Sequence, residues 1–221
     1  MGVVLLVRHG QASFGSDDYD VLSEAGWTQG RLLGGWLRER ALAPTAVIRG
    51  GMRRHRETAE AMAASSDWPE AAVDPGWDEF DHLSVVAAYP DVPEGELDRR
   101  EFQRVFELAT ARWSGGGHDR EYAEPWPAFR GRVRSAFRVA AGEAGPGGSV
   151  VVVSSGGPIA AVCADLVDPG ADDATYARLW SRFNTVLVNS AVTRVVVGST
   201  GARLLTFNEH PHLEAEHLTY R

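Results

Sequence analysis

A cation, an imidazole and a flexible residue stand together at Arg8, His9 and Gly10, directly after the apolar run at residues 3–7. Histidine can act as a nucleophile or a proton carrier near neutral pH. Arginine binds phosphate and carboxylate groups through paired hydrogen bonds. The apolar run is typical of a buried strand, and ligands bind at the carboxyl ends of strands in α/β sheets. The pattern therefore favours an anion site with His9 as its reactive group, and a surface turn that happens to hold Arg and His is the alternative.

Three further groups of residues could contribute to such a site. Arg54 lies in a basic stretch that opens a predicted helix, and helix N-termini favour anions. Glu79 stands among charged residues around one phenylalanine, which suits a general acid. Ser155 and Gly156 follow the valine run at residues 150–153, where glycine lets backbone N–H groups approach an anion. Taken singly, these groups are more typical of a solvated basic face, an exposed loop and an ordinary glycine turn than of a functional site.

The elements that must position these residues alternate between strands and helices. Apolar runs predict strands at residues 3–7, 46–48, 150–153, 187–189, 192–197 and 203–207. Helical periodicity and capping residues predict helices at residues 24–40 with Ser23 as N-cap, 53–64, 97–113 and 127–141, and another that starts near Pro158 as its first residue. This alternation predicts an α/β fold, a three-layer α/β/α sandwich with a mainly parallel central sheet. We expect one domain over residues 1–221, with a helical cap insert at roughly residues 81–122.

Composition narrows the classes of protein that this chain could represent. The 221 residues include 44% apolar residues and carry a formal net charge of −8, which disfavours nucleic-acid binding. Cys163 is the only cysteine, so an intramolecular disulfide is impossible and a thiolate metal site is disfavoured. No stretch approaches the roughly 20 apolar residues of a membrane helix. We expect a cytoplasmic protein with no membrane partner, and a homodimer paired through strands near the C-terminus stays open.

Taken together and in order, these motifs resemble those of the histidine phosphatase superfamily, the phosphoglycerate-mutase-like proteins. The matching segments are Leu6-Val7-Arg8-His9-Gly10, the helix opening at residues 22–29, Arg54 with Thr58-Ala59, Trp77-Asp78-Glu79-Phe80, and Asn189 with His212-Leu213. The resemblance covers essentially the whole chain. Its motifs are specific jointly and not singly.

The resemblance implies a mechanism for the residues that match. His9 would attack a phosphomonoester in line and become a phosphohistidine, while Arg8 and Arg54 hold the phosphoryl oxygens. Glu79 would protonate the leaving alcohol and then activate the water that releases phosphate. The arginines supply the positive charge, so the resemblance implies neither a metal nor an organic cofactor. The other residues expected to bind the phosphate are Gln11, Ser13, Ser155 and Gly156.

The chain departs from the family at Ser155, where the resemblance leads us to expect a second histidine. Serine is shorter and neutral and has a single donor. A lost charged hydrogen bond to the phosphoryl group would cost roughly 1.5–3 kcal/mol, about one to two decades in rate. His55 or His82 could reach in as a substitute, Ser155 and the Gly156 N–H could suffice, or both histidines could be ordinary polar side chains.

These observations predict a phosphomonoesterase that acts on a small phosphorylated metabolite without a metal. Two alternatives stay open. One is phosphoryl transfer of the phosphoglycerate-mutase type, which the stretch from Gln11 to Ser13 disfavours because mutases usually continue differently there. The other is a weakly active or non-catalytic protein that binds a phosphorylated ligand, which Ser155 favours and which His9 and Glu79 disfavour.

Overall fold

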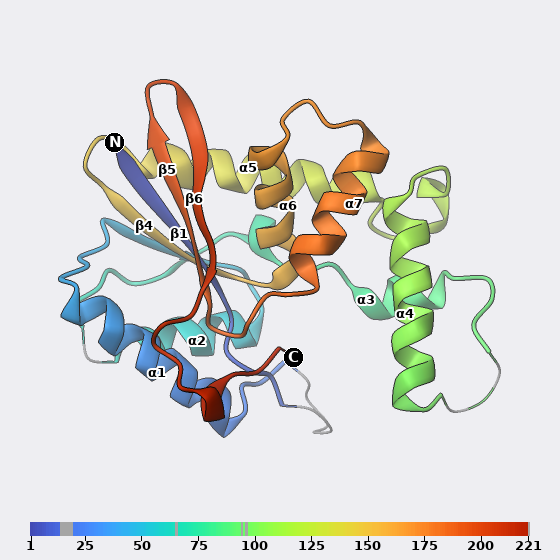
Figure 1. Ribbon diagram of the computed structural model, residues 1–221, viewed down its shortest axis with the longest axis horizontal. Helices are drawn as coiled ribbons and strands as arrows, with labels where there is room; N and C mark the ends of the chain where they lie inside the picture. Colours follow the sequence, from blue (N-terminus) through green and yellow to red (C-terminus); the bar gives the residue numbers. More distant parts are fainter. Residues whose placement is uncertain (14–19, 65, 94, 96, 221) are drawn as a thin grey trace.

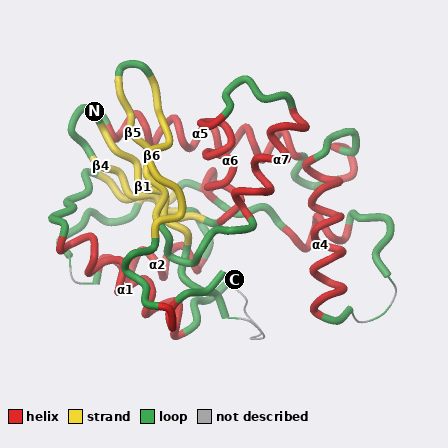
Figure 2. Tube along the Cα trace, in the orientation of Figure 1, coloured by secondary structure: helices red, strands yellow, loops and turns green. Residues whose placement is uncertain are grey.

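The computed structural model describes residues 1–13, 20–64, 66–93, 95 and 97–220, and a mixed, mostly parallel sheet lies at its centre (Figures 1 and 2). The six strands are arranged in the order β3-β2-β4-β1-β5-β6. Their bounds are β1 Gly2–Arg8, β2 Ala46–Arg49, β3 Ala72–Val73, β4 Ser149–Ser154, β5 Val192–Gly198 and β6 Gly201–Glu209. Strands β1 to β4 run parallel to one another. Strand β5 runs antiparallel to β1, and β6 runs antiparallel to β5. The sheet is thus mainly parallel, as the alternation of strands and helices predicts.

Helices cover both faces of this sheet, and together the layers form an α/β/α sandwich (Figure 1). Their bounds are α1 Glu24–Glu39, α2 Arg53–Ala63, α3 His82–Ala87, α4 Arg99–Ser114, α5 Trp126–Ala144, α6 Gly156–Val167 and α7 Asp173–Asn184, with short 3₁₀ turns η1 Pro75–Trp77, η2 Asp119–Glu121 and η3 Ala215–His217. The α1–α2 pair lies on one face, and α5 and α6 lie on the other with α7 packed against α6. Within the described part of the chain, no helix has the length and apolarity needed to cross a membrane.

The apolar run of β1 contributes side chains to the cores on both faces of the sheet. Val4 and Leu6 belong to the core shared with α5 and α6, whereas Leu5 and Val7 pack with the apolar residues of α1 and α2. All four side chains are buried. Successive strand residues point to opposite faces, so a strand covered on both sides needs a continuous apolar run. This explains why β1 and β4 could be recognised in the sequence.

A cluster of stacked rings joins α4, α5 and α7 to the segment after η1. We call this the aromatic cluster: Phe80, Trp113, Trp126, Phe129 and Trp180. The ring centroids of Phe80 and Trp113 are 4.7 Å apart, and those of Trp113 and Trp126 are 4.8 Å apart. Rings at such distances add to the stability that their buried area provides. The cluster holds α4, which lies to one side of the sheet (Figure 1), against the rest of the molecule.

Residues 81–122 contain α3, α4 and η2, so this segment is helical, as expected. It follows directly on the segment that carries Glu79. Its role as a cap over bound substrate stays a prediction.

Two predicted features of secondary structure are wrong, and one long helix was not predicted. Residues 187–189 form a buried turn and not a strand, because their polar backbone groups bond outside the sheet: Val188 N donates to Asn208 Oδ1 and Asn189 N donates to Thr219 O. The helix α7 was not expected. Pro158 is the third residue of α6 and not the first, a position that proline tolerates because the N–H groups of the first helical turn have no partner within the helix.

Candidate active site

The ends of two neighbouring parallel strands bring the candidate residues together. Arg8 at the end of β1 is in register with Ser154 at the end of β4, and His9 N donates to Ser154 O at 2.8 Å. His9 and Ser155 therefore follow these strands side by side. The first turn of α2 adds Arg54 and His55, and both of their side chains are buried.

The surroundings of His9 leave one of its ring nitrogens available for attack. Nδ1 lies 2.6 Å from the carbonyl oxygen of Gly10. Because a carbonyl oxygen only accepts, Nδ1 carries the hydrogen and Nε2 keeps its lone pair. Burial lowers the pKa of His9 well below its usual range, and the nearby charges of Arg54 and Arg8 and the ring of His55 lower it further. The imidazole is held neutral, the form in which Nε2 is nucleophilic.

Backbone contacts fix the position of His9 from its other side. Its carbonyl oxygen accepts hydrogen bonds from Ser190 N at 3.2 Å and from Asn189 Nδ2 at 3.3 Å. Asn189 in turn accepts from Thr219 Oγ1 at 2.9 Å. Asn189 therefore supports His9 through its backbone, which gives a physical reason for its place among the matching motifs.

The two arginines have different partners in this structure. Arg8 Nη1 donates to the carbonyl oxygens of Leu187 and Tyr220. Arg54 Nη1 donates to Asp20 Oδ1 at 2.7 Å, and its Nη2 lies 3.5 Å from Ser155 Oγ. The carboxylate of Asp20 also accepts from Arg53 N at 2.7 Å, so it lies against the N-terminus of α2. That end of α2 and Arg54 together bind the carboxylate of Asp20, and a phosphate contact by Arg54 stays a prediction.

Glu79 is held at the start of α6 by two backbone N–H groups. Its Oε2 accepts from Gly157 N at 3.0 Å and its Oε1 from Phe80 N at 3.2 Å. A Cβ at position 157 would lie 2.1 Å from Oε1, so glycine is required for this close approach. Burial raises the pKa of Glu79, and the two N–H groups and Arg54 only partly offset this. The carboxyl group keeps its proton to higher pH, as a general acid needs.

Side chains from α5 and β4 hold the segment before Glu79 through its backbone carbonyl groups. Arg132 from α5 donates to the carbonyl oxygens of Gly76 at 3.1 Å and Asp78 at 2.7 Å. Ser154 Oγ donates to Trp77 O at 2.7 Å. These contacts were not expected from the sequence, because Arg132 sits in an amphipathic helix that shows no motif.

Ser155 stands where the resemblance leads us to expect a histidine, and its side chain contacts another histidine, His55. Its Oγ lies 2.7 Å from His55 Nε2, and the two residues are 1% and 0% exposed. The ring centroid of His55 is 5.8 Å from that of His9. His82 packs its ring against Phe106, with the centroids 6.3 Å apart. Of the two candidate substitutes, the structure brings His55 to Ser155.

Gln11 and Ser13 are placed less directly. The side-chain oxygen of Gln11 accepts from Ser23 Oγ at 3.2 Å, at the N-cap of α1. Ser13 N donates to Val21 O at 2.8 Å. Gly156 is the first residue of α6, beside Ser155. Phosphate contacts by these three residues stay predictions.

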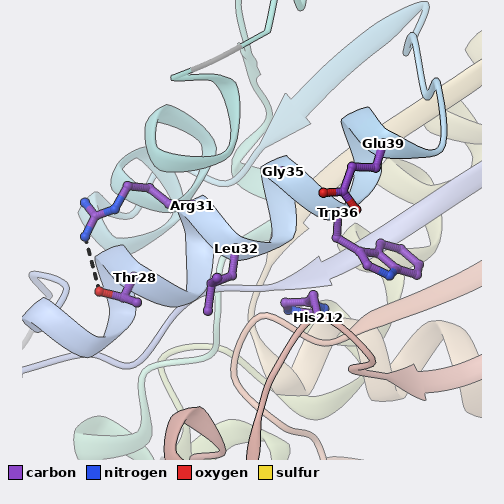
Figure 3. Close-up of a pocket in the computed structure, with 7 residues that line it drawn as sticks. All are labelled: Thr28, Arg31, Leu32, Gly35, Trp36, Glu39 and His212. Atoms are coloured by element: carbon purple, nitrogen blue, oxygen red, sulfur yellow. Dashed lines mark hydrogen bonds between the residues drawn. The ribbon is translucent and has the colours of Figure 1, made fainter.

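One cavity among the described residues is lined by a candidate site residue. A cavity of about 280 Å³ beside Glu79 is lined by Glu79, Phe80, Asp81, Ser84, Val85, Trp113, Ala123 and Glu124. A larger one of about 380 Å³ lies on the outer side of α1, and its seven lining residues, among them Trp36 and His212, include none of the candidate site residues (Figure 3). Of these two cavities, the one at Glu79 is the one that lies beside a candidate site residue.

No cluster of three or more His, Cys, Asp or Glu side chains in the described ranges is arranged to hold a metal ion. In the His-x-His pair near the C-terminus, His210 Nδ1 donates to Asn208 O at 2.7 Å and His212 Nε2 lies 2.9 Å from Ser190 Oγ. These two rings thus bond to separate partners.

Comparison with known proteins identifies a family and a set of similar folds. The family model for the histidine phosphatase superfamily (branch 1) matches residues 4–210. YhfR of Bacillus stearothermophilus is similar with a TM-score of 0.69 and 20% identity, over 96% of this chain and 99% of that one.

Two further solved structures are similar over nearly their whole length. A mutant of phosphoserine phosphatase from Entamoeba histolytica, in complex with phosphoserine, gives a TM-score of 0.67 at 16% identity over 97% of this chain and 100% of that one. The mycobacterial glucosyl-3-phosphoglycerate phosphatase gives 0.64 at 21% over 94% and 99%. No curated protein matches the sequence.

Proposed function

The chain belongs to the histidine phosphatase superfamily, and from this premise we propose that it hydrolyses small phosphomonoesters through a phosphohistidine at His9, without a metal ion. The observation that carries the proposal is the hydrogen bond from His9 Nδ1 to Gly10 O, which leaves Nε2 as a neutral nucleophile. Phosphatases among the similar solved structures support the reaction class.

In the first step, His9 Nε2 attacks phosphorus and the bond from phosphorus to the ester oxygen breaks. The bonding electron pair leaves with that oxygen, and Glu79 gives it a proton, so the product is a neutral alcohol. Arg54 offsets the negative charge on the phosphoryl oxygens, and Arg8 is proposed to do the same. Fixed cations that face developing charge are the main source of catalysis in phosphoryl transfer.

In the second step, the Glu79 carboxylate takes a proton from water as the water attacks phosphorus. The P–N bond breaks, its electron pair returns to Nε2, and inorganic phosphate leaves. Splitting the reaction in this way replaces one difficult displacement by two easier ones. His9 and Glu79 both return to their starting protonation states.

We infer the substrate class from the cavity beside Glu79. The leaving oxygen must lie within reach of that carboxyl group, and the cavity of about 280 Å³ beside it is proposed to hold the organic part of the substrate. This volume suits a small metabolite and not a protein segment. The rings of Phe80 and Trp113 line it together with the carboxylates of Asp81 and Glu124.

The proposal is tested by phosphate release from a broad panel of small phosphomonoesters, with His9→Ala as control. We expect turnover by the wild-type protein on at least one ester and none by the variant. No turnover above the variant on any ester would overturn the proposal. Net transfer of the phosphoryl group to an added alcohol, without release of phosphate, would instead indicate a mutase.

A cytoplasmic location, the lack of a nucleic-acid partner and a homodimer remain part of the proposal. The single cysteine supports a cytoplasmic location, and the net charge of −8 supports the lack of a nucleic-acid partner. Cell fractionation and sedimentation of the purified protein test them.

A further inference from the structure

We propose that His55 is a positioning residue of this site, which orients the Ser155 hydroxyl so that Ser155 donates a hydrogen bond to the phosphoryl group. The inference rests on the proposed function, because it concerns the same phosphoryl pocket. It assigns a role to a helix residue that belongs to none of the motifs matched above.

The side chain of Ser155 is turned toward this pocket and not toward its own helix. Ser155 precedes α6 at the N-cap position, where serine usually accepts a hydrogen bond from the helix backbone. Here its side chain makes no such bond, and Oγ lies 2.7 Å from His55 Nε2 and 3.5 Å from Arg54 Nη2. The position of the hydroxyl is therefore set by α2.

The donors around Ser155 decide where its proton points. Arg54 only donates, and His55 also donates in the tautomer that we assign to it, with its hydrogen on Nε2. In that tautomer Oγ accepts from Nε2 at 2.7 Å and faces Arg54 Nη2 at 3.5 Å. The hydroxyl hydrogen is then directed to a third group, which in an occupied site is a phosphoryl oxygen bound by Arg54.

The space around His55 is shaped for an imidazole. A Cβ at position 50 would lie 2.3 Å from His55 Nδ1 and 2.6 Å from Asp78 Oδ1, so Gly50 leaves the room that both side chains need. Nδ1 makes no hydrogen bond to any described residue, and Asp78 Oδ1 is 3.9 Å away. A histidine that serves only the core usually has both ring nitrogens bonded. His55 instead has one nitrogen on a site residue and the other facing a carboxylate.

Charge explains how this arrangement responds to a ligand. Burial lowers the pKa of His55 well below its usual range, and Arg54 and Arg49 lower it further. The other groups that face it are His9 and Asp78. A bound phosphoryl dianion would counter both arginines and raise the pKa of His55. His55 would then carry a hydrogen on each ring nitrogen. Its Nδ1–H would face Asp78, and its Nε2–H would still donate to Ser155 Oγ.

A double-mutant cycle tests whether His55 acts through Ser155. The variants are His55→Ala, Ser155→Ala and the double variant, and the readouts are kcat/KM on the best ester and the Kd for inorganic phosphate. We expect His55→Ala to lower kcat/KM about tenfold or more in the wild-type background and less than about threefold in the Ser155→Ala background. Equal losses in both backgrounds would overturn the proposal. His118→Ala, which removes a half-exposed histidine outside the site, is the matched control and should change neither readout.

A swap of the two residues keeps the proposal falsifiable if His55→Ala folds poorly. Ser155→His alone should lower activity, because the new ring meets His55 where Oγ already lies 2.7 Å from Nε2. His55→Ala combined with Ser155→His puts one imidazole back into the same space, and we expect at least a tenfold recovery over either single variant. A double variant no better than the worse single one, with an unchanged thermal midpoint, would contradict the proposal.

The phosphate Kd separates this inference from the proposed function. If the wild-type protein hydrolyses no ester, the proposed function has failed, yet the cycle can still be measured on phosphate affinity. We expect the same non-additive pattern there. An additive pattern in phosphate Kd would overturn the role of His55 even in an active enzyme.

Discussion

His9 and Glu79 have opposite protonation requirements, and burial satisfies both. Burial disfavours the charged form of either group, so it lowers the pKa of His9 and raises that of Glu79. Both shifts favour the uncharged forms that the proposed roles need, a neutral His9 and a protonated Glu79. One apolar environment prepares both partners of the reaction.

The direction of these shifts predicts the pH profile of kcat/KM. Activity should persist to pH values below 6.5, because the lowered pKa keeps His9 neutral there. It should fall on the alkaline side, as Glu79 loses its proton above its raised pKa. Glu79→Gln should lower the rate by about a hundredfold or more and remove this alkaline limb.

Comparison with that variant isolates Glu79 in the pH experiment, since ionisation of the substrate affects both proteins alike. An alkaline limb of the same midpoint in Glu79→Gln would show that another group is the acid.

At the residue scale, the sequence predicted which groups lie near one another better than how they contact. His9 and Ser155 follow neighbouring strands, Arg54 lies in the first turn of α2, and Glu79 is bound by the first turn of α6. The partner of Ser155 could not be predicted, because His55 and His82 are equally close to matched motifs in the sequence. Only the packing of α2 against β4 determines that the His55 ring reaches Ser155.

The turn from β4 into α6 is the element that links the proposed acid, Glu79, to the proposed nucleophile, His9. It follows a strand that pairs with β1, so the position of His9 is set directly by β4. Its Gly157 N–H binds Glu79, and its Ser154 side chain binds the segment before Glu79. A change of shape in this turn should therefore affect catalysis more than stability.

Gly157→Ala tests this role of the turn. The added Cβ would lie 2.1 Å from Glu79 Oε1, so the carboxyl group must move. We expect kcat/KM to fall by about tenfold to a hundredfold, since small misplacements of a catalytic group are costly. Gly131→Ala on α5, where a Cβ meets nothing within 4 Å, is the control and should keep full activity while stabilising the helix by about 0.5–1 kcal/mol. Full activity of Gly157→Ala would show that this contact does not position Glu79.

The errors at the element scale have physical causes. Leu187 and Val188 are apolar and buried as in a strand, but Leu187 packs into the main core and Val188 packs against Leu213 and Leu218 of the C-terminal segment, not within a sheet. The helix α7 carried a readable signal that was missed: Asp172 caps it, and Tyr176, Leu179, Trp180 and Phe183 follow at helical spacing. Short α3 could not be predicted, since six residues hold too little periodicity.

Across the whole molecule, the aromatic cluster joins α4, within residues 81–122, to α5, α7 and the segment that carries Glu79. Phe80, next to Glu79, stacks on Trp113 of α4, and Trp113 Nε1 donates to Glu124 O at 2.8 Å. Stability and the shape of the cavity at Glu79 are thus coupled through the same rings. The strand order could not be predicted, because β1 pairs with β4 and β5 from distant parts of the chain.

Truncation of the cluster should destabilise the whole fold. Trp113 is 1% exposed, so Trp113→Ala is expected to lower the free energy of unfolding by about 3–5 kcal/mol in denaturant titrations. Phe102 on the same helix is 36% exposed, and Phe102→Ala should cost less than about 1 kcal/mol. Similar losses for both variants would show that the cluster has no special part in stability.

The central claim is that His9 carries the phosphoryl group during turnover, and trapping tests it most directly. Glu79→Gln slows the attack of water, while an ester with a good leaving group, such as p-nitrophenyl phosphate, needs little help from an acid in the first step. Mixed with this ester and quenched in base, the variant should release one nitrophenolate per enzyme in a burst, and mass spectrometry should find one phosphoryl group on His9. Steady turnover with no burst and no phosphate on His9, in a variant that still hydrolyses the ester, would contradict the account.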